Sequence, residues 1–293
     1  MKLSNQKVGA LFILSGTALF GLYGVFSRLI KLGFNTFSQT FIIGFIAAIT
    51  ILVVFKYRRY SWKKIQRGDM LWFVLWGTSG ALVTALMFLS FNNIAIATSY
   101  FMFYSMMVVA GIIFGKIFFL EEFNILKFMS LSLSIIGLVF VFYSETGPAF
   151  IKYEMFALMG GILAGFWNTA SKKISSNYAS TQMMLINSSF MIIVGILGMI
   201  IMKEPIPLSI PIEAWGYIIL YAILELVAAI LIILGFKHLE AQKASLLMPI
   251  EVVFAAIFGF IFYKEIPTIL VLIGGLLIMI GAIMPNIKNT SNK

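Results

Sequence analysis

GLYGVFSRLI at Gly21–Ile30 returns in altered form 144 residues later, as GFWNTASKKI at Gly165–Ile174. In both stretches a glycine and an aromatic residue are followed, at the same spacing, by serine, a cation and isoleucine. The same offset relates Gly115–Glu121 to Gly259–Glu265. One register over such distances indicates an internal duplication and predicts two structurally equivalent halves.

Most of the chain around these landmarks is apolar. Its 293 residues are 61% hydrophobic and 11% charged, with a mean hydropathy of +1.03. A soluble domain of this composition has too few polar residues to cover its surface, whereas lipid-facing side chains need no polarity. Crossing the bilayer core of about 30 Å takes roughly 20 apolar residues in a helix, so we predict an all-α polytopic membrane protein embedded in a lipid bilayer. Gly, Pro, Asn and charge clusters delimit ten transmembrane helices, at residues 8–29, 36–55, 70–91, 95–118, 125–143, 153–172, 180–202, 214–236, 241–263 and 268–285.

Each half of the chain, 1–144 and 145–293, carries five of these spans. An odd number places the second half upside down in the membrane relative to the first, which predicts two inverted five-helix repeats. Of the 21 Lys and Arg residues, 16 fall on the side of the N-terminus and five on the other. Because cytoplasmic loops carry the excess of Lys and Arg, we expect both termini in the cytoplasm of a bacterial cell, with the chain in its cytoplasmic membrane. The net charge of +10 is therefore a topology signal, and no nucleic-acid partner is expected.

The most specific stretch for a family resemblance is Ala241–Glu265, AQKASLLMPIEVVFAAIFGFIFYKE. This stretch has an alanine-led start, a proline at Pro249 and a closing glutamate. In these features the chain resembles the EamA-type branch of the drug/metabolite transporter superfamily. Its first-half counterpart, Ala97–Glu121, has Ser105 where that family often has proline, and Gly44 lies near the place of an arginine often found in the second helix. The resemblance implies a central cavity lined by helices of both halves, with the fifth and tenth helices outside, and transport of a small organic solute.

Two carboxylates are expected at mid-membrane depth, Glu225 in the eighth span and Glu251 in the ninth. An ionisable group there costs about 2.5–3.5 kcal/mol on insertion scales, so it usually faces a cavity and has a function. Such a carboxyl can carry a coupling proton or balance the charge of a cationic solute. We favour this role for Glu225 over a carboxyl that only bonds a neighbouring helix. For Glu251 both interpretations stay open, because its carboxyl can equally satisfy backbone groups freed by Pro249.

Polar-tipped aromatic and amide side chains complete the predicted solute site. Tyr23 and Trp167 occupy equivalent places in the two halves, beside small residues. An O–H or N–H group deep in a membrane needs a partner, which a wet cavity supplies, although hydrogen bonding between helices is the alternative for each. The substrate-binding candidates are Glu225, Tyr23, Trp167, Trp76, Tyr100, Tyr104, Asn168 and Gln242, with Asn187 as a further amide of the same kind.

Pro249 and Ser105 are predicted to serve as hinges. Pro249 lacks a backbone N–H, so it removes one helical hydrogen bond and should kink the ninth span. Its repeat counterpart Ser105 can also bend a helix, by hydrogen-bonding backward to the preceding turn. The alternative for both positions is a static bend.

Other classes of function have little support in the sequence. One aspartate, one histidine and no cysteine leave neither a metal cluster nor a paired-aspartate protease, so no metal or cofactor is expected. No H-E-x-x-H, G-x-S-x-G or G-x-x-x-x-G-K-[ST] motif occurs, which argues against a membrane-embedded enzyme and an ATP-driven pump. A purely structural membrane protein is disfavoured by the two carboxylates and the inverted repeat. We predict a secondary transporter of an organic cation or amino-acid-like solute, working by alternating access, with H⁺ as the candidate coupling ion and the direction of transport and oligomeric state left open.

Overall fold

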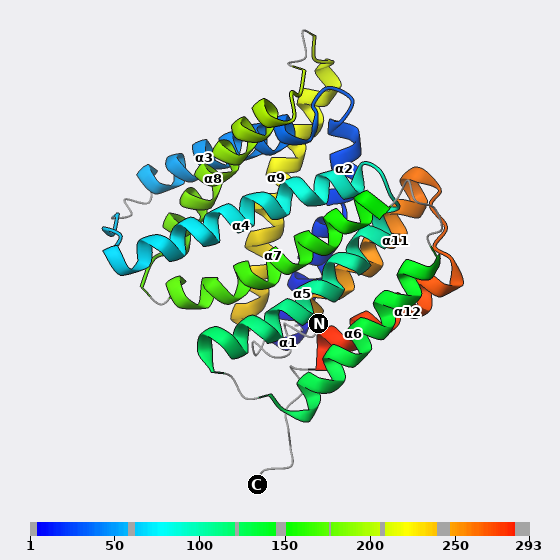
Figure 1. Ribbon diagram of the computed structural model, residues 1–293. Coiled ribbons are helices and arrows are strands. Elements are labelled where there is room, and N and C mark those ends of the chain that lie inside the picture. The colour runs from blue at the N-terminus through cyan, green and yellow to red at the C-terminus, as the bar shows by residue number, and fades with distance from the viewer. Residues whose placement is uncertain are drawn as a thin grey trace.

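The computed structural model describes residues 5–57, 62–120, 123–144, 151–175, 177–205, 209–238 and 247–284, and every regular element within these ranges is a helix (Figure 1). The helices are α1 (Asn5–Gly21), α2 (Tyr23–Ile30), α3 (Thr36–Tyr57), α4 (Arg67–Phe91), α5 (Ile96–Phe119), α6 (Ile125–Ser144), α7 (Ile151–Ser175), α8 (Ser180–Ile201), α9 (Ile212–His238), α11 (Ile250–Tyr263) and α12 (Ile269–Ile283).

Seven helical segments of the described chain are long and apolar enough to cross a membrane, and α1 and α2 together form the first of them. α11 and α12 are shorter apolar helices, and α7 is a 25-residue helix with charged residues near both ends. The all-helical prediction is confirmed, and the predicted spans agree with the observed helices to within a few residues at each end, apart from the ninth. That span, 241–263, is seen as a helix from Ile250, and residues 239–246 lie outside the described part.

The helices of the two halves pack against each other in pairs. α5 lies along α7, α3 along α8, α4 along α7 and α1 along α9 (Figure 1). Glycines allow the closest approaches: a Cβ on Gly161 of α7 would lie 2.2 Å from the carbonyl oxygen of Phe103 in α5. A Cβ on Gly195 of α8 would lie 2.7 Å from Phe41 of α3. Because small residues let helix backbones approach closely within a membrane, these contacts hold the two halves together by packing.

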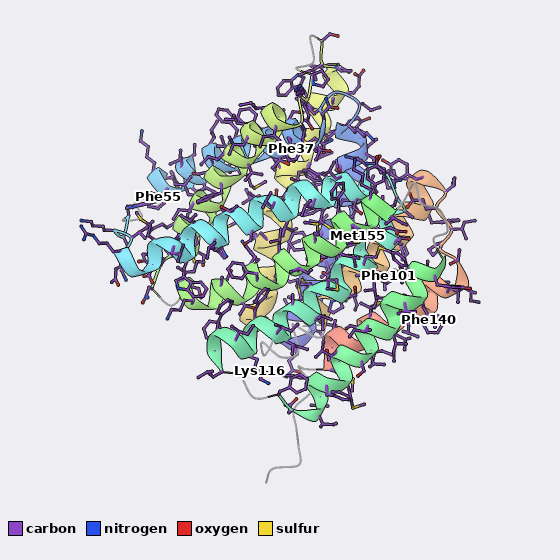
Figure 2. The ribbon with its side chains drawn as sticks, in the orientation of Figure 1. Phe37, Phe55, Phe101, Lys116, Phe140 and Met155 are labelled. Atoms are coloured by element: carbon purple, nitrogen blue, oxygen red, sulfur yellow. The ribbon has the colours of Figure 1, made fainter. Side chains whose placement is uncertain are left out.

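α6 and α12 pair with each other at one side of the molecule (Figure 1). Gly137 and Gly274 face each other here, and a Cβ on either would lie 2.5 Å from the other's carbonyl oxygen. Phe101 of α5 is labelled beside this pair in Figure 2, and its ring occupies the place that a Cβ on Gly275 would take. α6 and α12 correspond to the fifth and tenth predicted spans, and they take the outer position that the family resemblance implies.

Two helices from the first half of the chain begin at carboxylates from the second half. Glu204, after α8, accepts hydrogen bonds from the backbone N–H groups of Phe37 (3.0 Å) and Ser38 (3.1 Å) at the start of α3. Glu265, after α11, accepts one from the N–H of Ile96 (2.8 Å) at the start of α5. The first N–H groups of a helix lack partners within it, and negative charge there is favourable. Each carboxylate therefore stabilises a helix of the other half.

Two helix interruptions shape the region next to α11. The first span is broken at Leu22, between α1 and α2, and α11 begins directly after Pro249. The missing N–H of Pro249 agrees with a helix start at that point. A Cβ on Gly21 would lie 2.9 Å from the backbone nitrogen of Ala255, so the interruption of the first span packs on α11. Motion about Pro249 stays a prediction.

Candidate functional site

A cavity of about 740 Å³ lies between α3, α8 and α9, with α1, α2, α4 and α7 completing its wall. Pockets for small molecules typically measure about 300–1,000 Å³. Five predicted site residues line it, and they are Tyr23, Trp76, Trp167, Asn187 and Glu225. The wall has two sides of different character. α3 and α9 contribute mainly Ile, Leu and Ala, whereas α7 and α8 together contribute four serines, three methionines and Asn187.

An aromatic stack forms the α4–α7 part of the wall. The rings of Trp76 and Trp167 have centroids 5.5 Å apart and an interplanar angle of 16°. The indole N–H of Trp76 donates to the hydroxyl of Ser171 at 2.6 Å, and Ser171 donates to the carbonyl oxygen of Trp167 at 2.8 Å. Trp76 is only 2% exposed, so its indole is held in place behind Trp167. The stack presents a rigid π-face, which suits a planar or cationic group.

Three polar atoms of the wall are buried without a hydrogen-bond partner among the described residues: Tyr23 Oη, Trp167 Nε1 and Asn187 Oδ1. The last two adjoin Gly80 of α4, where a Cβ would lie 2.6 Å from Trp167 Nε1 and 2.4 Å from Asn187 Oδ1. Buried polar groups are nearly always paired, and leaving one unpaired costs about 1–3 kcal/mol. A donor and an acceptor therefore lie side by side against α4, both without a hydrogen-bond partner among the described residues.

Glu225 is the one acidic residue that the described chain contributes to the cavity wall, and its side chain is half-buried on α9. Within the described residues it forms no ion pair, and the wall contains no Lys or Arg. Tyr23 and Tyr221, whose ring centroids lie 4.9 Å apart, are close enough to interact with its carboxylate electrostatically. An intramembrane carboxyl that faces a cavity without a basic partner can bind a cation or a proton.

The second predicted carboxyl, Glu251, belongs to a separate buried cluster. It is 9% exposed, and its Oε2 accepts a hydrogen bond from Tyr104 Oη at 2.8 Å. Tyr100, with its ring centroid 6.4 Å from that of Tyr104, donates to the carbonyl oxygen of Phe20 at 2.8 Å. None of Tyr100, Tyr104 and Glu251 lines the cavity, whereas Phe20 does. The structure therefore places this predicted part of the site behind the wall.

The remaining predicted residues lie in three different settings. Asn168 was expected in the site, but it is exposed on α7 away from the cavity, because neighbouring residues on a helix point about 100° apart and Trp167 takes the inward direction. Gln242 lies outside the described residues. Ser105 is buried and donates to the carbonyl oxygen of Met102 at 2.7 Å, the backward bond expected, while α5 continues through it without a break.

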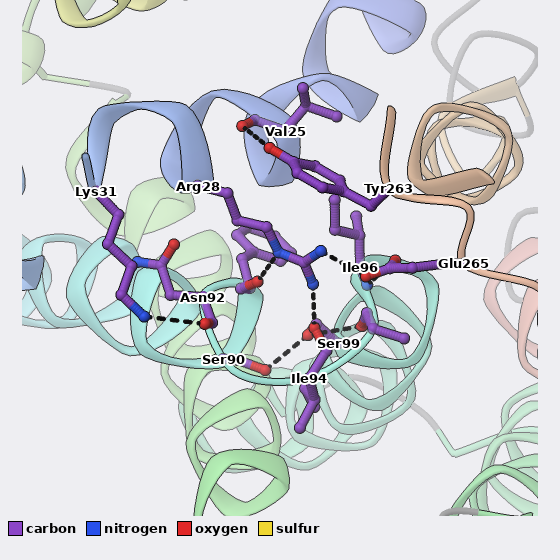
Figure 3. A network of polar contacts seen from close by, with 12 residues as sticks. Val25, Arg28, Lys31, Ser90, Asn92, Ile94, Ile96, Ser99, Tyr263 and Glu265 are labelled. Atoms are coloured by element: carbon purple, nitrogen blue, oxygen red, sulfur yellow. Dashed lines mark hydrogen bonds and ion pairs between the residues drawn. The ribbon is translucent and has the colours of Figure 1, made fainter. Parts of the chain in front are cut away.

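A polar network centred on Arg28 joins three segments of the chain at one end of the molecule (Figure 3). Its Nη1 pairs with Glu265 Oε1 at 2.5 Å, and its other nitrogens donate to the carbonyl oxygens of Phe91 and Ile94. The guanidinium carbon lies 4.6 Å from the ring centroid of Tyr263. α2, the α4–α5 connection and the end of α11 are thereby joined around one cation.

The cavity extends toward the other end of the molecule. It reaches Ser175 at the end of α7 and Ser180 at the start of α8, and both residues are exposed. The α3–α4 segment docks beside this opening, where Lys63 and Gln182 exchange two hydrogen bonds of 3.1 and 2.7 Å. The charge distribution predicts that this open end faces the cytoplasm.

Sequence reasoning missed the serine side of the wall. A single serine in an apolar helix gives no functional signal, because it readily bonds the carbonyl oxygen of the preceding turn. A usable pattern is nevertheless present, since Trp167, Ser171 and Ser175 follow one another at intervals of four residues and share one face of α7. Extending the argument from Trp167 along that face would have found both serines.

Paired helices from two related halves, with a cavity between them that has one apolar and one more polar side, are typical of a membrane transporter. The chain belongs to the EamA-like transporter family, whose model matches it twice, at residues 7–143 and 151–287. Both ends of the second match lie 144 residues beyond those of the first, which is the offset of the internal repeat. It is accordingly a multi-pass membrane protein of the drug/metabolite transporter superfamily.

Known proteins resemble the chain along nearly its whole length. The pseudopaline exporter CntI from two strains of Pseudomonas aeruginosa is 20% identical over 261 residues, which are 89% of this chain and 90% of the exporter. A solved crystal structure with 13% sequence identity covers 94% of this chain and 96% of its own, with a TM-score of 0.60. The latter likeness shows a shared fold.

Proposed function

We propose that this protein is a secondary transporter that moves a small organic cation across the bacterial cytoplasmic membrane by alternating access. In this proposal the ten predicted spans form two inverted halves, residues 1–144 and 145–293, with both termini in the cytoplasm. The doubled family match at an offset of 144 residues supports the two halves. The excess of Lys and Arg on the side of the N-terminus supports the orientation.

The carboxylate of Glu225, on a cavity wall to which the described residues contribute no Lys or Arg, is the observation that carries the proposal. A cationic solute balances its charge, whereas an anionic solute would add a second uncompensated charge at low dielectric. Trp167 lines the same cavity from the α7 side, and its π-face attracts cations through the ring quadrupole. An amino-acid-like solute fits as well, with its ammonium at Glu225 and a polar group at Trp167 and Asn187.

Alternating access is supported by the unequal ends of the molecule. The Arg28 network closes one end, while the cavity reaches exposed serines at the other. Two halves of inverted topology can exchange conformations, so that the closed end opens and the open end closes. In this scheme the structure corresponds to the state that is open toward the cytoplasm.

Proton coupling follows from the chemistry of one shared carboxyl. Glu225 cannot hold a proton and bind a cation at full charge at the same time, so the two ligands compete. Exchange of an inward proton for an outward cation then needs no other ionisable group. The related proteins are named as exporters, which favours export over import.

The test is a binding assay on purified protein, because a ligand that binds the folded state raises its thermal stability. We expect organic amines to raise the melting temperature of the native protein, and Glu225→Gln to lose at least nine-tenths of that affinity. Glu213→Gln is the matched control, because Glu213 is exposed in the first turn of the same helix. Equal stabilisation of the native protein and Glu225→Gln by the amines would remove Glu225 from the solute site.

A further inference from the structure

Two helix–helix contacts beside the cavity differ in how closely the helices pack, although the internal repeat makes the two contacts equivalent. At an offset of 144 residues α4 corresponds to α9, and α3 corresponds to α8. α4 packs along α8, whereas α3 and α9 meet only sparsely. On the packed side, a Cβ on Gly77 of α4 would lie 2.2 Å from the ring of Phe190 in α8. The counterparts of Gly77 and Gly80 in α9 are Tyr221 and Leu224, so α9 lacks the glycines that let α4 approach its partner.

The loose contact between α3 and α9 leaves a gap in the side of the cavity. Ile219, Ile223 and Leu226 recur on one face of α9, line the cavity and are nevertheless 48%, 53% and 38% exposed. Opposite them, Ile46 and Ala47 of α3 line the cavity and are partly exposed. These residues lie well inside their helices, at the depth where hydrocarbon rather than water surrounds a spanning helix. The gap between α3 and α9 therefore faces the interior of the bilayer.

The rim of this gap is apolar, and the cavity behind it is polar on its far side. A hydrated ion would have to shed its water to pass Ile219 and Ile223, whereas an aliphatic chain passes from lipid to rim without such a cost. Behind the rim lies the carboxylate of Glu225, and across the cavity are Ser171 and Asn187. A solute complementary to both sides has an aliphatic part and a cationic head.

We propose that the gap between α3 and α9 is a lateral entrance from the bilayer, and that the solute is an amphiphilic cation. Its aliphatic part lies against Ile219 and Ile223 while its head lies at Glu225. The proposal rests on the cation site of the proposed function and adds the route and the amphiphilic character. A lipid chain that only seals the gap is the alternative occupant.

Spin-label accessibility in lipid bilayers tests the entrance. The native chain has no cysteine, so Ala47→Cys and Ile223→Cys each carry one label. We expect both labels to be relaxed by oxygen, which concentrates in lipid, and to be shielded from a water-soluble nickel complex. Ile49→Cys, on the outward face of α3, is the lipid control, and Ser175→Cys at the open end is the aqueous control. Labels at 47 and 223 that match Ser175→Cys, or that respond to neither agent, overturn the lateral entrance.

Binding and uptake of alkyl-trimethylammonium ions test the solute class. Octyltrimethylammonium should bind at least tenfold more tightly than tetramethylammonium, after correction for partition into protein-free bilayers, because its chain adds buried apolar surface. Ala47→Phe should slow uptake of the octyl compound at least fivefold, while Ile49→Phe, on the outward face, leaves it unchanged. If a lipid only seals the gap, binding should show no chain-length preference and Ala47→Phe should have no effect. That result would overturn the proposal.

The outcomes separate this inference from the proposed function. If both ions bind equally and both lose binding in Glu225→Gln, the cation site stands and the lateral entrance falls. If neither ion binds the native protein, both proposals fall together.

Discussion

Arg28 and Glu265 stand 237 residues apart in the chain and form an ion pair of 2.5 Å between Nη1 and Oε1. The pair joins α2 to the end of α11, and its glutamate also accepts the N–H of Ile96 at the start of α5. Both side chains are 18% exposed, so water screens the pair only partly. This contact lies at the end of the molecule opposite the opening at Ser175.

Loss of the ion pair should open that end. In Arg28→Gln, a cysteine at Ala97, which is 2% exposed in the native protein, should react with an impermeant maleimide at least tenfold faster than in the native background. The double variant Arg28→Glu/Glu265→Arg restores opposite charges and should recover part of the protection. Equal labelling rates with and without Arg28 would show that the pair does not control access.

Tyr104 should stabilise the fold through Glu251. Tyr104→Phe leaves a buried carboxyl without its 2.8 Å hydrogen bond, which costs about 1–3 kcal/mol of unfolding free energy. Tyr143→Phe is the control, because Tyr143 is 77% exposed. In a double-mutant cycle with Glu251→Gln, the two losses should be less than additive. Fully additive losses would mean that the hydroxyl and the carboxyl act independently.

Gly80 should be a position where one methyl group disturbs the site. In Gly80→Ala the new Cβ meets Asn187 Oδ1 and Trp167 Nε1 within 2.6 Å, so both side chains must shift. Such overpacking costs about 1–3 kcal/mol, and we expect solute affinity to fall at least fivefold. Gly216→Ala on α9 is the control, since nothing lies within 4 Å of its Cβ. Unchanged solute affinity in Gly80→Ala would show that Asn187 and Trp167 do not contribute to solute binding.

Lys64 provides a test of the orientation. A single cysteine at this exposed position between α3 and α4 should stay unlabelled by an impermeant thiol reagent in intact cells, and should react after permeabilisation. Ready labelling in intact cells would place this segment, and with it the open end of the cavity, outside the cell.

The sequence predicted those features that depend on local pattern. Helix positions follow from the length of apolar runs, and Trp76, Trp167, Tyr23 and Glu225 were found because polar atoms in such runs are rare and costly. Asn168 lies off the cavity wall because helix rotation is set by packing, and Trp167 takes the inward direction. Tyr100 and Tyr104 lie on α5, which contributes no residue to the described cavity wall. Tyr104 donates to Glu251 and Tyr100 to the carbonyl oxygen of Phe20.

The pairing of Arg28 with Glu265 depended on information that no local pattern contains. Both residues look like ordinary charges at membrane-helix ends, where contact with the interface explains them. Only the assembled fold brings α2, the α4–α5 connection and the end of α11 to one place. The repeat offset alone could not find the pair, because it relates equivalent positions rather than neighbours.

The caps supplied by Glu204 and Glu265 have a consequence for biosynthesis. The starts of α3 and α5 receive their acceptors from residues that leave the ribosome 166 to 169 positions later. Until then, the terminal N–H groups of Phe37, Ser38 and Ile96 depend on water or lipid head groups for partners. Helices α1 to α6 therefore emerge before α3 and α5 have the acceptors for their first N–H groups, and the last third of the nascent chain supplies those acceptors.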